Sequence, residues 1–389
     1  MPWQETCAMD ERMRLVADLL QKTAPVTTLC ACYGISRQTA YKWQRRYARQ
    51  GLVGLQELSR RPHTTPRALS AVDRETILAA RRAHPYWGPR KLRAYLQRRA
   101  PQERWPAAST IGDLLGRHGL ILARRRRRPT PRSLGSLTVP MLPNAVWGAD
   151  FKGHFRLGNG TRCHPLTVSD LHSRYVLRCD ALPAERTELV RPLFEEAFRC
   201  YGLPLSIRTD NGAPFASRAP GGLSRLSAWW VKLGIWPERI VPGCPQQNGC
   251  HERLHRSLKA ATARPPRHTL AAQQRAFARF CREFNIERPH EALGQQPPAT
   301  CYGPSPRPYP RRIEEPAYPT HFEVRRVRTT GEIKWRGQLV MITDVLTGEP
   351  LGLEEVHDGA WVVYFAAVPL GVLDDATHTL HVFPPARRP

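Results

Sequence analysis

The sequence predicts a multidomain chain that begins with all-α helix-turn-helix units, continues as a mixed α/β core and ends in a small all-β barrel of SH3 size. Apolar residues recur at helical spacing up to about residue 120, strand-like alternation starts after Pro143, and short strands broken by glycine turns follow Pro319. A chain of 389 residues also exceeds the usual size of one core. The expected domains are 1–58, 70–122, 141–293 and 320–384, with a basic linker at 123–140 and a Pro/Arg-rich linker at 294–319.

Charge indicates the kind of partner. The net charge is +26, and residues 1–135 hold 27 Lys and Arg against 9 Asp and Glu. Such asymmetry favours a polyanion, and nucleic acid is preferred to a membrane surface because no amphipathic anchor or lipidation motif accompanies it. The ten cysteines lack the spacing of a zinc finger, and the first residues contain no signal-peptide core. We therefore expect a cytoplasmic protein in a reducing compartment, with no membrane partner.

The third expected helix of the first unit has the layout of a recognition helix. Ser36 can cap it, and Ala40, Trp43 and Tyr47 can pack inward. Its outward side chains would then face the major groove, as in a helix-turn-helix. A plain three-helix bundle is the structural alternative. The candidate DNA-binding residues of this helix are Arg37, Gln38, Tyr41 and Arg45.

A second unit of three helices follows a proline-rich joint, and Ser109 is expected to cap its third helix. Next comes a run of five arginines, which is either a solvated linker or an arm that orders on phosphates or in a narrow minor groove. The arm is the favoured interpretation because its neighbours resemble DNA binders. The residues concerned are Arg124, Arg125, Arg126, Arg127 and Arg128.

Between residues 144 and 293 the pattern predicts three consecutive antiparallel strands, followed by alternating helices and strands. The helices are expected at Thr187–Tyr201, near 223–233, after Pro245 and at Leu270–Phe284. This order gives a mixed α/β sheet, in which catalytic side chains gather at strand ends and on an adjoining helix.

The helix that starts in the stretch PQQNGCHERLHRSLKA allows two chemistries. Asn248 is a good N-cap, and Glu252 lies near the positive end of the helix dipole, with Arg256 and Lys259 on the same face. His251, Glu252 and His255 also spell H-E-x-x-H, the signature of zinc proteases. That second interpretation loses on context, since the helix is basic and no obvious third ligand follows.

Three carboxylates stand where this topology could bring them together. Asp150 lies in the first strand, Asp210 follows the fourth strand in an Asp-Asn-Gly turn, and Glu252 begins the helix. Hard oxygen ligands from several elements are what a metal site for phosphoryl transfer needs. Each residue alone has an ordinary structural explanation, so only the joint pattern is informative.

The combined motifs W-x-x-D-F, T-D-N-G-x-x-F and Q-x-N-G-x-x-E resemble those of bacterial insertion-sequence transposases with a retroviral-integrase-type core. The resemblance covers almost the whole chain. It implies an RNase H-like core in which Asp150, Asp210 and Glu252 form a DDE triad that binds two Mg²⁺ ions, with Mn²⁺ able to substitute. It further implies cleavage at transposon 3′ ends and their joining to target DNA, basic contacts from Arg256 and Lys259, and a homo-oligomer on double-stranded DNA in the bacterial cytosol, associated with the nucleoid.

The chain departs from the family pattern in one place. Forty-one positions separate Asp210 from Glu252, which is longer than the usual gap, and the segment 217–225 has the glycine and proline content of a loop that could hold the excess. Asp170 is a spare carboxylate that we interpret as a turn residue. A DNA-binding protein with a catalytically silent core, derived from a transposase, remains the main alternative.

Overall fold

The chain forms two compact units, Met1–Ala68 and Leu69–Pro389. The computed structural model describes residues 7–59, 69–121, 137–241 and 243–383. The arginine run Arg124–Arg128 lies outside the described residues. No helix in the described ranges is both long enough and apolar enough to cross a bilayer.

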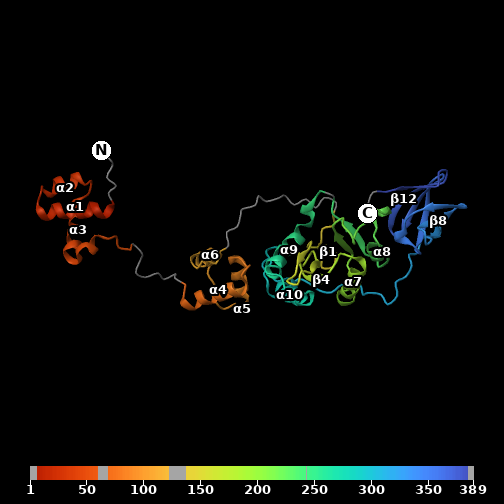
Figure 1. Cartoon of the computed structure of the whole chain (residues 1–389), viewed down its shortest axis with the longest axis horizontal. Coiled ribbons are helices and arrows are strands. Elements are labelled where there is room, and N and C mark those ends of the chain that lie inside the picture. The colour runs from red at the N-terminus through yellow and green to blue at the C-terminus, as the bar shows by residue number, and fades with distance from the viewer. Residues whose placement is uncertain (1–6, 60–68, 122–136, 242, 384–389) are drawn as a thin grey trace. The chain divides into compact units, whose positions relative to one another are not determined.

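The first unit is a three-helix domain (Figure 1). The hydroxyl of Ser36 accepts a hydrogen bond from the backbone N–H of Thr39 and caps α3, as the sequence predicted. Ala40 and Trp43 are buried on the inner face of α3, where they join residues of α1 and α2 in one core. The helices are α1 (Ala8–Gln21), α2 (Val26–Cys32) and α3 (Arg37–Gln50), followed by the 3₁₀ turn η1 (Gly51–Leu55).

A second set of three helices begins the larger unit, with Trp87, Leu92 and Ile111 among its buried residues. Ser70 caps its first helix through the backbone N–H of Asp73. Ser109 does not cap the third helix, because that helix already begins at Ala108 and Ser109 lies in its first turn. The helices are α4 (Ala71–Ala83), α5 (Pro89–Arg99) and α6 (Ala108–Arg117).

The α/β core is built on a six-stranded sheet with the order β2-β3-β1-β5-β6, in which β4 pairs with β3. The first strands are antiparallel, whereas β5 runs parallel to β1 and β6 runs parallel to β5. The expected topology is therefore confirmed, with one short extra strand. The strands are β1 (Val146–Phe151), β2 (Phe155–Arg156), β3 (Arg162–Asp170), β4 (Val176–Leu182), β5 (Ser206–Thr209) and β6 (Trp236–Arg239).

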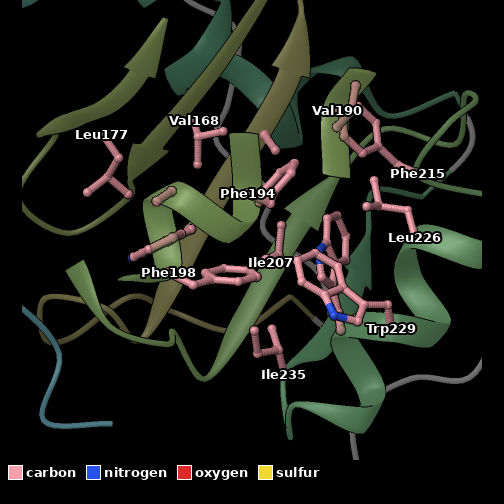
Figure 2. Packing of buried hydrophobic residues seen from close by; sticks show 14 of the residues in the cluster. Val168, Leu177, Val190, Phe194, Phe198, Ile207, Phe215, Leu226, Trp229 and Ile235 are labelled. Atoms are coloured by element: carbon pink, nitrogen blue, oxygen red, sulfur yellow. The ribbon is translucent and has the colours of Figure 1, made fainter. Parts of the chain in front are cut away.

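Helices cover both faces of this sheet. One face packs against α7 and α8, where Phe194, Phe198 and Trp229 meet Ile207 of β5 (Figure 2). A separate cluster joins α9 and α10 to β3 and β4. The helices are α7 (Thr187–Tyr201), α8 (Arg225–Lys232), α9 (Gly249–Thr262) and α10 (Leu270–Arg282), and one π turn, η4 (Glu283–Glu287), continues α10.

The alternation of β1 assigns its residues to these two faces. Trp147 and Ala149 are buried in the α7–α8 cluster. Gly148 and Asp150 therefore face α9, because side chains of a strand alternate between the two faces of a sheet. A Cβ on Gly148 would lie 2.4 Å from Cε1 of His251, so only glycine lets α9 approach the strand this closely.

The segment 217–225, which the sequence predicted as a loop, lies almost entirely between β5 and α8. A bridge between Ala216 and Leu223 closes it, and the backbone N–H of Ser217 donates to the carbonyl of Gly222. A short 3₁₀ turn, η2 (Pro220–Gly222), lies inside it. The segment is therefore a compact loop closed by its own backbone contacts.

The Pro/Arg-rich segment 294–319 leads toward the last domain, and it also lies along the core. Its carbonyl at Gly303 accepts a hydrogen bond from the amide of Asn144, and the N–H of Ser305 donates to the carbonyl of Tyr201. Tyr302 and Tyr309 pack against the core cluster. The 3₁₀ turns η5 (Glu291–Leu293) and η6 (Pro298–Thr300) stand at its start.

The last domain is all β, as predicted. A five-stranded antiparallel sheet with the order β13-β12-β11-β10-β7 and the hairpin β8–β9 enclose Trp335, Val363 and Phe365. The strands are β7 (Glu323–Arg326), β8 (Glu332–Trp335), β9 (Gln338–Met341), β10 (Pro350–His357), β11 (Ala360–Phe365), β12 (Val368–Asp374) and β13 (Thr379–Val382), with the 3₁₀ turn η7 (Asp344–Leu346) between β9 and β10.

Candidate active site

Asp150 and Asp210 lie at the same edge of the sheet on neighbouring parallel strands. The register pairs Gly148 of β1 with Arg208 of β5. Each aspartate follows its strand's member of that pair by two residues, so the two carboxylates come side by side. The sequence placed Asp150 in the first strand and Asp210 after the fourth, in a topology that could bring them together.

Burial and the neighbouring carboxylate shift the protonation of Asp150. Burial first, and the charge of Asp210 second, raise the pKa of Asp150 to about 7. The hydrogen bond from Asn248, the backbone N–H of Phe151 and the charge of Lys152 oppose this rise. A carboxylate whose negative charge is so poorly compensated is a strong position for a cation.

Asp210 is held by its own turn. Its Oδ1 accepts a hydrogen bond from the backbone N–H of Gly212 at 3.1 Å, and the amide of Asn211 donates to the carbonyl of Ile240 at 2.9 Å. The Asp-Asn-Gly sequence is therefore an Asx turn whose carboxylate keeps its second oxygen free of this bond. Asp210 can therefore stabilise its turn and still offer an oxygen to a metal ion.

The N-terminus of α9 reaches Asp150 through Asn248. Asn248 occupies the N-cap position, as predicted, but its side chain makes no capping hydrogen bond. Its amide Nδ2 donates to Asp150 Oδ2 at 2.7 Å instead. The expected cap is thus correct in position and wrong in the role of its side chain.

His255 lies beside the same carboxylate, further along α9. Its Nδ1 lies 3.8 Å from Asp150 Oδ2, and its Nε2 lies 2.7 Å from the hydroxyl of Thr167. Thr167 is the cross-strand partner of Asp150 and donates to the Asp150 carbonyl at 3.2 Å. Burial above all lowers the pKa of His255 to about 2, so the imidazole is neutral beside Asp150.

Glu252 does not join the two aspartates in this structure. It is exposed in the first turn of α9, and within the described part of the chain no three His, Cys, Asp or Glu side chains are grouped to hold a metal. Its place on the helix is nevertheless close, because Asn248 and His255 stand four residues before and three residues after it, and such residues are neighbours on a helix surface. The structure brings two of the three predicted carboxylates together and places the third beside their contacts.

The two histidines of the H-E-x-x-H motif are turned toward the sheet. Nε2 of His251 lies 3.5 Å from the hydroxyl of Ser169, and His255 bonds to Thr167. Burial lowers the pKa of His251 to about 4. Both imidazoles pack as buried side chains between α9 and β3, which gives the motif a structural explanation in place of the zinc interpretation.

The basic face of α9 has the predicted arrangement. Arg256 and Lys259 are exposed together with Glu252, whereas Leu254 and Leu258 are buried against the sheet. A small hollow of about 30 Å³ is lined by Lys259 and by Lys152, two residues after Asp150. Two positively charged side chains therefore share a hollow near the strand end that carries Asp150.

Asp170, the spare carboxylate, is a buried turn residue. Its oxygens accept hydrogen bonds from the backbone N–H groups of Asn144 and Ser173 and from the Ser173 hydroxyl. It is fully buried and lies at the end of β3. The interpretation of this residue as a turn anchor is consistent with these contacts.

In the first unit, all four candidate residues of the recognition helix are exposed. Arg37, Gln38, Tyr41 and Arg45 share the outer side of α3, opposite Ala40 and Trp43.

Sequence reasoning missed Gly148 and Lys152, and it gave Asn248 only a capping role. The sequence shows a glycine in W-G-A-D and an asparagine in Q-N-G, but it does not show which residues they contact. Those partners, His251 and Asp150, lie about 100 positions away in the chain.

Comparison with known proteins supports this organisation. Residues 11–63 match a helix-turn-helix domain, 39–115 a homeodomain-like domain, 140–245 and 233–298 integrase core domains, and 322–381 the C-terminal domain of IS481 family transposases. These matches follow the same order as the helical units, the α/β core and the β domain.

Two relatives belong to insertion elements. The 39.2 kDa protein of insertion element IS476 from Xanthomonas euvesicatoria is 32% identical over 179 residues, which are 45% of this chain and 50% of that protein. The 31.7 kDa protein of insertion element IS407 from Burkholderia multivorans is 29% identical over 215 residues, 55% of this chain and 74% of that protein. The chain thus spans half the length of the first relative and about three quarters of the second.

The solved structures similar to this chain include two of retroviral origin. The catalytic core domain of HTLV-2 integrase in complex with magnesium is 18% identical, with a TM-score of 0.34 over 42% of this chain and all of that chain. A chain in the structure of the simian T-cell lymphotropic virus intasome in complex with PP2A regulatory subunit B56 gamma is 18% identical, with a TM-score of 0.36 over 76% of this chain and 97% of that chain. The integrase core and IS481-type domain matches, together with the insertion-element relatives, support a bacterial insertion-sequence transposase with an integrase-like core.

Proposed function

We propose that this protein is a DNA transposase of the DDE type, which cleaves at the 3′ ends of its transposon and joins them to target DNA by metal-dependent phosphodiester transfer. The observation that carries the proposal is the pair Asp150 and Asp210 at one sheet edge, with α9 and its Glu252 bound to that edge through Asn248. The domain matches supply the DNA-binding units on the N-terminal side.

A divalent cation fits this position. The carboxylate of Asp150 is mostly buried, and the negative charge of Asp210 repels its own negative charge. Carboxylate oxygens are the ligands that Mg²⁺ prefers. We assign Asp150, Asp210 and Glu252 as the ligands of two Mg²⁺ ions, for which Mn²⁺ can substitute. Ions held there would activate the attacking hydroxyl and stabilise the departing 3′ oxygen.

The chain's own residues then divide the work. Asn248 fixes the orientation of Asp150, and the neutral imidazole of His255 beside it adds no positive charge that would compete with a cation. Glu252 is exposed and completes the site by turning its side chain toward Asp150, since ligand geometry in a free enzyme is often loose and tightens on binding. This placement of Glu252 is the step that most needs a test.

DNA is held along several basic surfaces in this proposal. Arg37, Gln38, Tyr41 and Arg45 read the transposon end in the major groove, while Arg256 and Lys259 contact phosphates next to the cleaved bond. The arginine run Arg124–Arg128 adds phosphate or minor-groove contacts. Joining two ends to one target requires two active sites, so the protein acts as a homo-oligomer on double-stranded DNA.

The exposure of Glu252 favours one alternative, a transposase-derived DNA-binding protein whose core is silent. The test is an oligonucleotide cleavage and strand-transfer assay on DNA that carries the inverted repeats flanking the gene, in Mg²⁺ and in Mn²⁺. The wild-type chain should cleave and join, whereas D150N, D210N and E252Q should each lose both steps and keep nearly unchanged binding to the ends. Strand transfer by D150N would refute the assignment, and inactivity of the wild type in both metals would favour the silent core.

A further inference from the structure

A hollow of about 300 Å³ lies on the flank of α9, outside the candidate active site. Its walls are the first turns of α9, the end of β3 with the turn that follows it, residues 284–292, and Lys91 of α5. This volume is at the lower limit of pockets that bind small organic molecules. Neither Asp150 nor Asp210 lines it, so it is a separate feature of the core.

Four guanidinium groups and the ammonium group of Lys91 line this hollow, against one carboxylate. The arginines are Arg174, Arg253, Arg256 and Arg288, and the carboxylate is that of Glu291. Like charges gathered around one hollow repel each other unless an anion enters. The lining therefore selects a negatively charged ligand.

The arginines are partly anchored and still have donors to offer. Nη1 of Arg174 lies 2.7 Å from the sulfur of Cys250, and Nη2 of Arg288 donates to the hydroxyl of Ser257 at 2.9 Å. Nε of Arg288 and Nε2 of His290 are buried and make no hydrogen bond in the described part of the chain. Buried polar atoms without partners are rare in folded proteins, and here two of them belong to residues of one hollow.

The remaining lining is apolar. Leu171, Leu254 and Phe284 contribute to it, and the ring of Phe284 stands under the guanidinium of Arg288, with Cζ 5.1 Å from the ring centroid. An apolar patch beside several guanidiniums suits a ligand that has both a flat ring and a phosphate. Arginine planes and apolar side chains are the surfaces on which unpaired bases stack.

From this combination we propose that the hollow binds an unpaired nucleotide of a DNA strand, with its phosphate on the arginines and its base against the apolar patch. The inference rests on the proposed DNA function of the core. Arg256 links the two sites, because it lines the hollow and stands one helical turn after Glu252.

Binding of two DNA probes tests the proposal. The full chain is titrated in EDTA against one fluorescent duplex in blunt form and the same duplex with an unpaired overhang of thymidines. We expect the overhang to bind roughly 10-fold more tightly, which corresponds to one stacked base. R253Q and R174Q should lose most of that preference, whereas R275Q, which removes an exposed arginine of α10, should keep it. Equal wild-type affinity for both probes would overturn the proposal, and so would an equal loss for both probes in R253Q.

A cross-link gives a second readout that needs no variant. An overhang with 5-iodouracil, irradiated on the wild-type chain, should attach to peptides from residues 250–257 or 284–292. Attachment only elsewhere contradicts the proposal. Binding is measured without metal on uncleaved DNA, so the overhang preference can be observed even if the chain does not cleave. A chain that cleaves but shows no overhang preference would contradict the nucleotide site in the hollow and leave the proposed transposase function standing.

Discussion

Nδ2 of Asn248 donates a hydrogen bond to Oδ2 of Asp150 at 2.7 Å, and this bond joins the start of α9 to the end of β1. It stabilises the ionised carboxylate and fixes which oxygen remains open for a cation. The bond also sets where α9 begins relative to the strand, because the helix starts at the next residue. The first prediction concerns this contact.

Replacing Asn248 by Ala should weaken Mg²⁺ binding by roughly 10- to 100-fold, the usual cost of losing a partner of a metal ligand. Cleavage should recover in part at high Mg²⁺, because the carboxylates themselves remain. The measurement is the cleavage rate as a function of Mg²⁺ concentration. N159A, in the hairpin after β2, is the control, since Asn159 bonds only to the local turn at Thr161 among the side-chain contacts described. An N248A enzyme with unchanged Mg²⁺ dependence would show that the contact has no part in binding.

The second prediction concerns pH. The folded protein raises the pKa of Asp150 from 3.8 to about 7, so the ionised form is penalised in the fold. The penalty is absent below pH 4, grows between pH 4 and 7 and is complete above pH 7. In EDTA at pH 8, D150N should therefore have a larger free energy of unfolding than the wild type, by up to a few kcal/mol. Its melting temperature should be correspondingly higher. The difference should shrink as the pH falls toward 4.

The same shift predicts the direction for the metal. Mg²⁺ requires the ionised carboxylate, so its affinity should rise with pH up to about 7, and binding below that pH should release a proton. Calorimetry in two buffers of different ionisation enthalpy measures the proton directly. Added Mg²⁺ should raise the melting temperature of the wild type and leave that of D150N almost unchanged. Metal stabilisation of D150N equal to that of the wild type would contradict the assignment of Asp150 as a ligand.

The third prediction concerns Gly148. A Cβ at this position would lie 2.4 Å from Cε1 of His251 and 2.9 Å from Cδ2 of Leu171, so G148A must push α9 away from β1. We expect a loss of roughly 1–3 kcal/mol in stability. Faster hydrogen exchange in residues 249–262, with little change in α7, would locate the effect. G112A in α6 is the control, because its new Cβ would make only an ordinary contact of 3.5 Å with Pro89.

The fourth prediction concerns the basic face of α9. Arg256 and Lys259 are exposed and stand on the same face as Glu252. If they contact phosphates, R256Q and K259Q should weaken DNA binding about equally on all sequences and should each reduce the slope of log K against log salt by about 1. R279Q, on the exposed side of α10, serves as a control for charge alone. A loss confined to one DNA sequence would indicate a base contact instead.

Local patterns predicted much of this architecture. The helix Thr187–Tyr201 has the bounds that its apolar spacing indicated, and the proximity of Asp150 and Asp210 follows from two strand ends in a parallel pair. Helix bounds depend on residues that are neighbours in the sequence, and the pairing of strand ends depends on the order of strands and helices. Both can be read from one sequence.

Other features depend on contacts between distant residues. That Asn248 would bind Asp150 instead of capping its helix follows from how α9 meets β1, and the sequence pattern of the helix is the same in both cases. Segment 294–319 has the composition of a linker, yet its backbone bonds to Asn144 and Tyr201 of the core. The exposed position of Glu252 is likewise a property of packing, because helical periodicity gives only its face.

The last prediction concerns the recognition helix, where the first exposed residues of α3 should read base edges. R37A should reduce affinity for the transposon end by roughly 5- to 150-fold, the range of a good arginine–guanine contact, and should relax selection at one base pair. Binding of a library of end sequences measures both effects. R14A on α1 removes an exposed arginine that pairs with Glu11, and it should change affinity little and selection not at all. If R37A lowered affinity by the same factor on every sequence, Arg37 would be a phosphate contact, and base reading would have to come from Gln38, Tyr41 or Arg45.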